Sequence, residues 1–329
     1  VLNPPEAIGK FGGDTDNWQW PRHTGDFSML RVYADKDGNP AEYSEDNVPL
    51  EPKHHLPVNI QEKERKDFAM IMGYPGRTQR YLTSWDIARK RDVENPIIVK
   101  VRGECLDIMR NRMDQSEKIR LQYASKYASL MNYYKLFGGQ IESFNDLGTV
   151  ESLQEYEEEF TDWIESAPER KEKYSDVLPT LERTSEQITP YMTPYHYFVQ
   201  GIISCVDATQ YAFGFISVAP LLEDYDADDA DQRARVEAAL GDIKEGLDKH
   251  FKDFDLATDK AIMKEALQLY YDDVPKEYHP EIMEDFEKKG ADKFVDKLYK
   301  KSFLVNKEET QEFLNDPDYK DLTKDPIFE

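Results

Sequence analysis

The pattern of hydrophobic and polar positions along the chain changes near residue 82. Before that point, residues 27–33 are rich in strand-forming types, and a turn sequence follows at residues 36–40. A short, continuous apolar run at residues 68–72 is typical of a strand that is covered on both faces. We therefore expect the first 80 residues to form strands and turns, as part of a larger sheet or barrel.

After residue 82 the pattern becomes helical. Asn95 can cap a helix whose first position is Pro96, and no strong stop signal follows until Gly138 and Gly139. A helix of about forty residues would be roughly 60 Å long. Its second half carries an apolar stripe with helical spacing, made of Ile119, Tyr123, Tyr127, Leu130, Tyr134 and Phe137. This stripe predicts the face of the helix that packs into the core.

Further helices are predicted along the rest of the chain. A second amphipathic helix covers residues 150–164, and charged helices include residues 260–270 and 280–289. The apolar segment at residues 195–222 is interrupted by polar residues, and its longest clean run is too short to cross a bilayer. We predict a buried helix there, with Thr193 as its N-cap and Pro194 at its first position.

Charge and cysteine content narrow the function classes. The 329 residues include 42 basic and 66 acidic side chains, which gives a net charge of −24. Such a surface repels phosphates, so nucleic acids and anionic membranes are disfavoured as partners. Cys105 and Cys205 fit no metal-ligand spacing, and they could form one disulfide or remain two buried thiols. The chain starts at Val1 without an initiator methionine, so its lack of a signal peptide carries no information.

Residues 9–27 have the composition of a functional site. This stretch contains four glycines, two tryptophans, three aspartates and a histidine. Tryptophan is costly to expose and glycine is costly to order, so an ordinary surface loop is not built in this way. The stretch predicts unusual backbone angles and fixed polar groups beside large flat side chains.

Other candidate sites fail on spacing. Asp224, Asp226 and Asp228 invite a calcium site, but an EF-hand loop that starts at Asp224 would place Asp229 and Arg235 where glycine and glutamate are needed. The histidines form no His-Glu-x-x-His pair, no serine occupies a nucleophile elbow, and no phosphate-binding loop follows the glycines. We therefore predict no metal and no cofactor. Taken alone, the residues offer carboxylates without an evident nucleophile.

Three motifs resemble the dipeptidyl-peptidase 7 and 11 family of bacterial serine exopeptidases. They are residues 9–27, which are followed by Arg31-Val-Tyr-Ala, residues 72–81 (Met-Gly-Tyr-Pro-Gly-Arg-Thr-Gln-Arg-Tyr), and Asn132-Tyr-Tyr-Lys before Gly138. The first motif is long and specific, and the resemblance is strong from residue 1 to about residue 145. Gln19 departs from the family, where methionine is expected.

The resemblance implies a fold and a setting. In this family a chymotrypsin-like double β-barrel carries a Ser-His-Asp triad, and a large helical domain caps it. The expected fold class is therefore α+β, with residues 1–80 as part of the barrel and residues 81–329 as a helical cap that is incomplete at its C-terminus. It also implies peptide substrates with a free N-terminus, a homodimer for the full-length protein, and a periplasmic, secreted or cell-surface location.

The resemblance also assigns roles to four residues. Asp26 matches the triad aspartate, which would accept the Nδ1 hydrogen bond of the catalytic histidine. Asn17, Trp18 and Asn132 match the residues that hold the amino group of the substrate. Without the resemblance, Asp26 would be a turn aspartate, Trp18 a core residue and Asn132 an exposed helix residue. Helical geometry places Asn132 nearly opposite the apolar stripe, so it is not buried with that face.

Two neighbouring residues of the first motif receive no such role. His23 is interpreted as a neighbour of the site and Trp20 as a core residue. In this family the catalytic histidine lies upstream and the serine downstream, both outside this chain, which alone is expected to be inactive.

Two hypotheses remain open from the sequence. The first is a piece of a serine dipeptidyl-peptidase that contains one triad member and the helical cap. The second is a non-catalytic module that binds peptide N-termini without cleaving them. The preference for an acidic or a hydrophobic residue before the scissile bond depends, in the family, on a segment that lies outside this chain.

Overall fold

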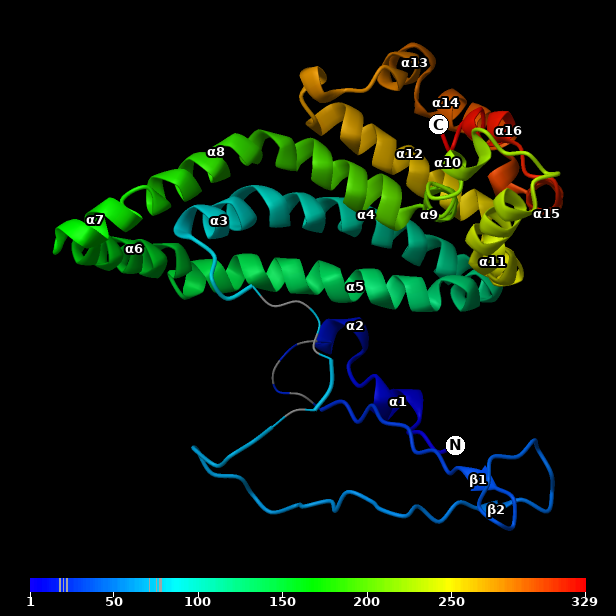
Figure 1. Ribbon diagram of the computed structural model, residues 1–329, viewed down its shortest axis with the longest axis horizontal. Helices are drawn as coiled ribbons and strands as arrows, with labels where there is room; N and C mark the ends of the chain where they lie inside the picture. The colour runs from blue at the N-terminus through cyan, green and yellow to red at the C-terminus, as the bar shows by residue number, and fades with distance from the viewer. Residues whose placement is uncertain (18, 20, 22, 71, 75, 77–78) are drawn as a thin grey trace. The chain divides into compact units, whose positions relative to one another are not determined.

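The computed structural model describes the chain except for residues 18, 20, 22, 71, 75 and 77–78. It divides into two compact units, Val1–Tyr81 and Leu82–Glu329 (Figure 1). Each unit is described by itself below. The first holds the segment that was predicted as strands and turns, and the second holds the predicted helices.

The Val1–Tyr81 unit has little regular structure in its described residues. It contains two single-turn helices, α1 (Glu6–Gly9) and α2 (Gly13–Asp16), and two strands, β1 (Tyr33–Ala34) and β2 (Val48–Pro49). The strands pair antiparallel, with Tyr33 opposite Pro49 and Ala34 opposite Val48. The turn predicted at residues 36–40 is confirmed, since Asp35 Oδ1 accepts hydrogen bonds from the backbone N–H groups of Asp37 and Asn39 at 2.9 and 2.8 Å.

The predicted fold class is wrong. The described part of residues 1–80 contains no barrel, and of the predicted strand at residues 27–33 only Tyr33 lies in a strand. The other predicted strand has no strand residue among those described, with Phe68 88% exposed and Ile71 outside the described residues. Strand-forming residue types specify a strand only where a neighbouring strand supplies backbone and side-chain partners. Among the described residues of this unit, such pairing is limited to β1 with β2 and to one isolated bridge between Leu2 and Met29.

The Leu82–Glu329 unit begins with a capped helix that the sequence reading missed. The Thr83 hydroxyl accepts a hydrogen bond from the Asp86 N–H, and the Asp86 carboxylate accepts one from the Thr83 N–H. This capping box starts α3 (Ser84–Arg89), which continues into the π-helix η1 (Lys90–Glu94) and α4 (Asn95–Gln115). Asn95, the predicted N-cap, therefore lies inside a continuous helix.

The single long helix predicted up to Gly138 is two helices. α4 ends at Gln115, Ser116 is extended, and α5 (Glu117–Asp146) follows with the Ser116 hydroxyl accepting a hydrogen bond from the Ile119 N–H at 3.4 Å. Gly138 and Gly139 lie inside α5, because glycine permits a helix end without forcing one. Figure 1 shows α4 and α5 packed side by side along their lengths.

The predicted apolar stripe of α5 is confirmed as its core face. Tyr123, Tyr127 and Leu130 are buried, and Ile119 and Tyr134 pack against the same core. The second predicted amphipathic helix is also present, as α6 (Thr149–Glu165). The 3.6-residue period therefore located the core face of α5, whereas on α6 only Val150 and Ile164 of the predicted face are buried and Tyr156 is exposed.

The apolar segment at residues 195–222 is only partly buried, since Phe198, Phe213 and Ile216 are exposed, and it is not the one buried helix that was predicted. Thr193 and Pro194, its predicted start, lie inside α8 (Val177–His196), which follows α7 (Pro168–Tyr174). The segment then divides among the π-helix η2 (Tyr197–Ile203), α9 (Asp207–Phe213) and α10 (Ala219–Leu222). Prolines lack the N–H that marks a helix interior, so Pro194 resembled a helix start to sequence reasoning.

The remaining elements complete two hydrophobic cores. One core lies where α4, α5, α12 and α14 meet, and the other joins α10, α11, α15 and α16. The elements not yet given are α11 (Ala230–Asp253), α12 (Leu256–Asp273), η3 (Lys276–Tyr278), α13 (Ile282–Lys289), α14 (Ala291–Lys301), η4 (Phe303–Val305), α15 (Lys307–Asn315) and α16 (Tyr319–Thr323). The charged helices predicted at residues 260–270 and 280–289 correspond to α12 and α13.

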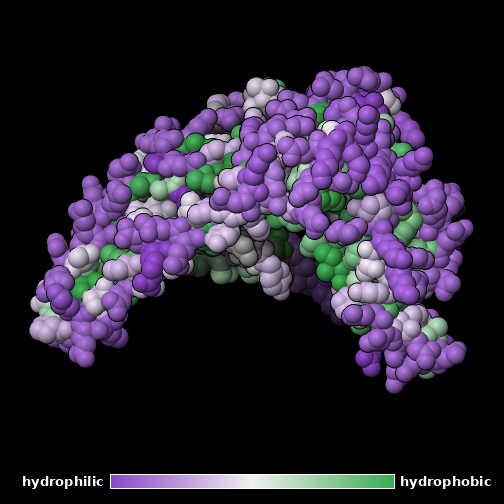
Figure 2. Space-filling model, turned by 90° about the horizontal axis from the view of Figure 1, so that it is seen from above, coloured by the Kyte–Doolittle hydropathy of each residue, from purple (hydrophilic) through white to green (hydrophobic). Residues whose placement is uncertain are grey.

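The surface is mostly hydrophilic, as expected for a chain with many charged residues. The face drawn in Figure 2 is mostly hydrophilic, with hydrophobic residues in separate patches. Among the helices that the structure describes, none combines the length and apolar character needed to span a membrane.

Candidate functional site

The stretch at residues 9–27 is a folded-back loop in the Val1–Tyr81 unit. Gly12 and Gly13 have φ angles of 71° and 58°, a region that favours glycine, and they lead from α1 into α2. The Gly25 N–H donates to the Ile8 carbonyl at 2.9 Å, which joins the end of the stretch to its beginning. The glycines therefore shape the backbone, as their composition predicted.

Two of the four predicted site residues lie in this loop as described. Asn17 ends α2 in an extended conformation, and Asp26 is exposed directly after Gly25. Beyond Asp26, the backbones of Leu2 and Met29 exchange two hydrogen bonds, at 2.9 and 2.7 Å. Backbone contacts on both sides thus anchor the segment that presents the Asp26 carboxylate to solvent.

Two tryptophans of the loop carry predictions that the structure does not test. Trp18, predicted to hold the substrate, and Trp20, predicted for the core, lie outside the described residues. His23 is described, and its ring packs edge-on against Phe11 with 5.7 Å between ring centroids.

Asn132 occupies an exposed position on α5 in the Leu82–Glu329 unit, away from the buried stripe of that helix. The neighbouring residues tie α5 to α4: the Arg102 guanidinium lies 4.9 Å from the centroid of the Tyr133 ring, and Gly103 lies against the Tyr134 ring. Asn132 is therefore held on a rigid two-helix support. Because Asn17 and Asp26 belong to the other unit, the assembly of all predicted residues into one site remains a prediction.

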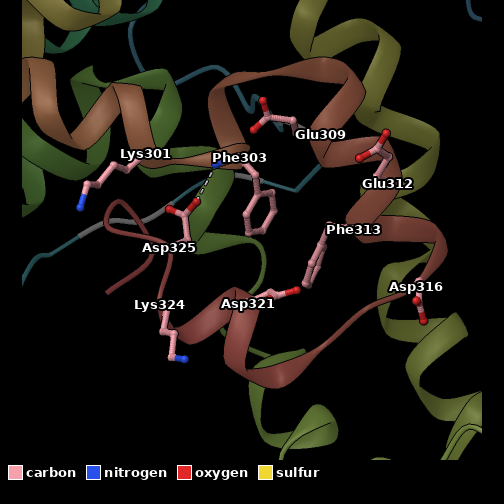
Figure 3. A pocket seen from close by; sticks show the side chains of 9 residues that line it. All are labelled: Lys301, Phe303, Glu309, Glu312, Phe313, Asp316, Asp321, Lys324 and Asp325. Carbon is pink, nitrogen blue, oxygen red and sulfur yellow. Dashed lines mark hydrogen bonds between the residues drawn. The ribbon is translucent and has the colours of Figure 1, made fainter.

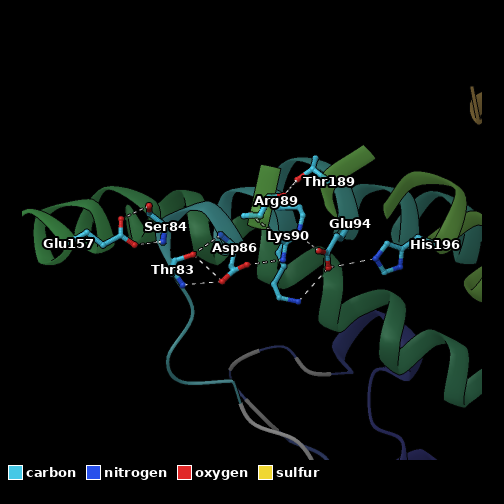
Figure 4. Close-up of polar contacts among 10 residues, drawn as sticks. Thr83, Ser84, Asp86, Arg89, Lys90, Glu94, Glu157, Thr189 and His196 are labelled. Atoms are coloured by element: carbon cyan, nitrogen blue, oxygen red, sulfur yellow. Dashed lines mark hydrogen bonds and ion pairs between the residues drawn. The ribbon is translucent and has the colours of Figure 1, made fainter. Parts of the chain in front are cut away.

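A buried polar network that sequence reasoning missed joins η1 to α8 (Figure 4). Arg89 donates from Nε to Glu94 Oε1 at 2.7 Å and from Nη1 to the Ser185 hydroxyl at 2.5 Å. His196 Nε2 lies 3.6 Å from Glu94 Oε2. Burial works to raise the pKa of Glu94, but His196, Arg89 and Lys90 outweigh it and lower that pKa to about 2. This network holds an ionised carboxylate inside the helical unit.

A second buried network surrounds the start of α9. Asp259, at 0% exposure, accepts hydrogen bonds from the Asp207 N–H at 2.5 Å, the Ala208 N–H at 3.2 Å and the Tyr299 hydroxyl at 2.6 Å. The Asp207 carboxylate accepts from the Tyr123 hydroxyl at 2.9 Å and pairs with Lys126. Burial and the Asp207 charge raise the pKa of Asp259 to about 6. Its carboxylate therefore caps α9 from inside the core.

The second network borders a polar cavity of about 550 Å³ between α5, the start of α9 and α11. His250 lines this cavity with its ring stacked on Tyr211 at 4.1 Å, and burial lowers the pKa of His250 to about 4. The imidazole is therefore neutral at physiological pH. Asn132, the predicted site residue of this unit, does not line this cavity.

Another cavity, of about 460 Å³, has an acidic rim and an aromatic wall (Figure 3). Phe303 and Phe313 stack at 4.7 Å on one side, and the Asp325 carboxylate accepts a hydrogen bond from the Phe303 N–H at 2.9 Å. Charged residues complete the lining: Lys301, Glu309, Glu312, Asp316, Asp321 and Lys324. The Asp325 hydrogen bond shows that this carboxylate serves the local fold.

The acidic loop that suggested a calcium site contains a helix cap. Asp229 in the acidic loop caps α11 by accepting hydrogen bonds from the N–H groups of Asp231 and Gln232 at 2.9 and 3.1 Å. In the part of the chain that the structure describes, His, Cys, Asp and Glu side chains form no group that could hold a metal ion.

Comparisons with known proteins identify relatives of the whole chain. The peptidase S46 family model matches residues 1–329. The Asp/Glu-specific dipeptidyl-peptidase of Flavobacterium psychrophilum is 36% identical over 307 residues, which cover 92% of this chain and 41% of the relative. Dipeptidyl-peptidase 7 of Capnocytophaga gingivalis is 36% identical over 333 residues, which cover 99% of this chain and 45% of the relative.

A solved structure also matches. The crystal structure of Porphyromonas endodontalis DPP11 in complex with the dipeptide Arg-Glu has a TM-score of 0.75 at 33% identity, and the match covers 100% of this chain and 46% of that chain. The chain therefore spans less than half the length of these relatives.

Proposed function

The chain belongs to the peptidase S46 family, and on that basis we propose that it is part of a serine peptidase that releases dipeptides from the free N-terminus of peptides. The observation that carries this proposal is the match over the entire chain to relatives that are named dipeptidyl-peptidases. The full-length protein would perform the reaction, since the chain spans only 41–45% of those relatives.

In this proposal Asp26 is the aspartate of a Ser-His-Asp triad. Its carboxylate would accept the Nδ1 hydrogen bond of the catalytic histidine, fix the tautomer of the ring and stabilise the imidazolium that forms during acylation. Its exposed position on an anchored segment suits a partner that approaches from outside the described loop. The histidine and the serine would come from parts of the protein beyond this chain.

Asn17, Trp18 and Asn132 would hold the substrate by its amino end. An ammonium group is a pure donor, and an asparagine side-chain oxygen is a matching acceptor. Two asparagines on separate units could thus fix the ammonium at a set distance from the nucleophile, which would limit the product to a dipeptide. The exposure of Asn132 on the firmly packed α5 supports this role.

The proposed substrate is a peptide with a free N-terminus, and the choice between an acidic and a hydrophobic residue before the scissile bond stays open. Sequence identity does not favour either preference, since the Asp/Glu-specific enzyme and dipeptidyl-peptidase 7 are both 36% identical to this chain. The homodimer and the periplasmic, secreted or cell-surface location implied by the resemblance belong to the same proposal.

The test uses the full-length protein with pairs of peptides that differ only in N-terminal acetylation. We expect dipeptide release from each free peptide and none from its acetylated partner. Release of single amino acids or of internal fragments would overturn the proposal. Binding of free peptides without cleavage would support the alternative of a non-catalytic module that grips N-termini.

A further inference from the structure

The only two cysteines of the chain are both fully buried in the core of the helical unit. Cys105 lies in α4 and Cys205 lies between η2 and α9, and both are free with 0% exposure. They come from helices about one hundred residues apart in sequence. The mechanism proposed above uses neither of them.

The helices that carry the two cysteines run in parallel, with matching contacts along their length. Arg89 contacts Ser185, and further along Arg102 donates from Nε and Nη2 to Gln200 Oε1 at 3.0 and 2.7 Å. Residues of the first helix thus lie beside residues of the second that are just under one hundred positions later in the sequence. Cys105 and Cys205 are separated by a similar interval.

The two segments pack tightly one helical turn before the cysteines. A Cβ added to Gly201 would lie 3.0 Å from Cγ1 of Val101, so glycine is what lets η2 pack against α4. Cys105 follows Val101 by four residues and Cys205 follows Gly201 by four residues, on the same faces of the two segments. The register therefore brings the two thiols together.

The thiols contact each other directly. Cys105 hydrogen-bonds to the sulfur of Cys205, and Cys205 Sγ donates to the Gln200 carbonyl at 3.1 Å. The contact and burial raise the pKa of Cys105, whereas the contact with Cys105, with Arg102 and Lys126 nearby, lowers the pKa of Cys205 against its burial. In the packed core the thiolate form is therefore more favoured at Cys205 than at Cys105.

We propose that Cys105 and Cys205 form an intramolecular disulfide, made by exchange with a small-molecule disulfide while α4 and η2 pack together. In the first step the thiolate of one cysteine attacks one sulfur of the small disulfide, breaks its S–S bond and releases one small thiolate. The thiolate of the other cysteine then attacks the protein sulfur of this mixed disulfide and releases the second small thiolate. The two protein thiols are oxidised by two electrons in total, and the small disulfide is reduced to two thiols.

Burial of the two sulfurs limits disulfide formation to an early stage of folding. Because neither sulfur is exposed in the folded unit, the exchange occurs before the register closes over them. The bond then links α4 to the entrance of α9, next to Asp207, whose carboxylate pairs with Lys126 on α5. It would close a long loop and so restrict the unfolded chain.

The test refolds the full-length protein in a buffer of reduced and oxidised glutathione and maps its peptides by mass spectrometry. We expect one cross-linked species that contains the peptides of Cys105 and Cys205, lighter by two hydrogen atoms than their sum. Folded protein that was kept reduced should form it roughly tenfold or more slowly in the same buffer. Two separate thiol peptides after refolding would overturn the proposal, and equal rates would overturn its timing.

A stability measurement complements the mapping. A reductant should lower the midpoint of thermal unfolding of the refolded wild-type protein, and it should leave C105A and C205A unchanged, since each keeps a single thiol. An unchanged wild-type midpoint would contradict a stabilising cross-link. The peptide map needs no variant, so it decides the proposal even if a variant fails to fold.

Discussion

His196 at the end of α8 places its Nε2 atom 3.6 Å from the Oε2 atom of Glu94 in η1, so that two π-helical junctions of the helical unit meet at this contact between an imidazole and a carboxylate. π-helical turns inside α-helices often mark functional positions. Arg89 and Lys90 also face Glu94, at 2.7 and 3.4 Å. The carboxylate is therefore surrounded by cationic or ionisable partners in a place with little water.

This surrounding predicts a loss of stability in acid. The pKa of Glu94 is about 2 in the folded state against an ordinary value of 4.5, so its stabilising contribution is present above about pH 4.5 and disappears as the pH falls toward 2. Glu94→Gln should lower the free energy of unfolding at pH 7 by about 3 kcal/mol and remove part of this pH dependence. Denaturant unfolding at pH 7, 4 and 3 measures both effects.

The exposed Glu155→Gln on α6 is the matched control, because it makes the same chemical change without a buried partner. It should follow the wild-type pH curve within about 0.5 kcal/mol. A pH dependence in Glu94→Gln as steep as that of the wild type would contradict the assigned role of Glu94.

For Asp259 we expect the opposite pH dependence of the free energy of unfolding. Its folded pKa of about 6 lies above the ordinary 3.8, so its contribution favours the folded state fully below about pH 3.8 and is lost as the pH rises through 6. From this group alone the free energy of unfolding should fall by about 2 kcal/mol between pH 4 and pH 7. Asp259→Asn should flatten that slope in the same unfolding series, and an unaltered slope would contradict the raised pKa.

The capping box at Thr83 predicts a local stability effect. Thr83→Ala removes the acceptor for the Asp86 N–H at the start of α3 and should cost about 1 kcal/mol of unfolding free energy. Thr161→Ala is the control, since its hydroxyl bonds only the Glu157 carbonyl within α6. Equal effects of the two changes on denaturant unfolding would show that the cap contributes nothing.

Asn132 predicts an effect on substrate binding rather than on stability. In the full-length protein, Asn132→Ala should raise KM for peptides with a free N-terminus by roughly tenfold or more, because one hydrogen bond to an ammonium group is lost. Asn145→Ala, an exposed asparagine on the same helix, should leave KM unchanged. Steady-state kinetics on one peptide compares the two, and equal KM values would remove Asn132 from the proposed site.

The spacing of apolar residues predicted the core face of α5 well, whereas glycine and proline predicted the ends of the helices poorly. The α5 stripe was correct because one face of a helix must be apolar to pack, whatever its partners are. The boundaries at Gly138 and Thr193 were wrong because glycine and proline permit a helix end without requiring one. The barrel was wrong because strands depend on partners elsewhere in the chain or beyond it.

In the candidate site and the buried networks, local backbone features were predicted, whereas contacts between distant residues were missed. The glycines of residues 9–27 predicted the positive φ angles at Gly12 and Gly13, since that requirement is local. The pairs Glu94–His196 and Lys126–Asp207 were missed because each joins residues about eighty to one hundred positions apart, and single charges in helices have no sequence signature. The roles of Asp26, Asn17, Trp18 and Asn132 came from the resemblance alone.

The most direct test of the proposed function is dipeptide release by the full-length protein with Asp26→Ala, measured by mass spectrometry on a peptide with a free N-terminus. The account predicts that kcat falls by roughly 10⁴-fold while the thermal unfolding midpoint stays unchanged, because the histidine loses its orienting carboxylate. The control Asp46→Ala, another exposed aspartate of the same unit, should retain wild-type turnover. Near wild-type release by Asp26→Ala would contradict the account.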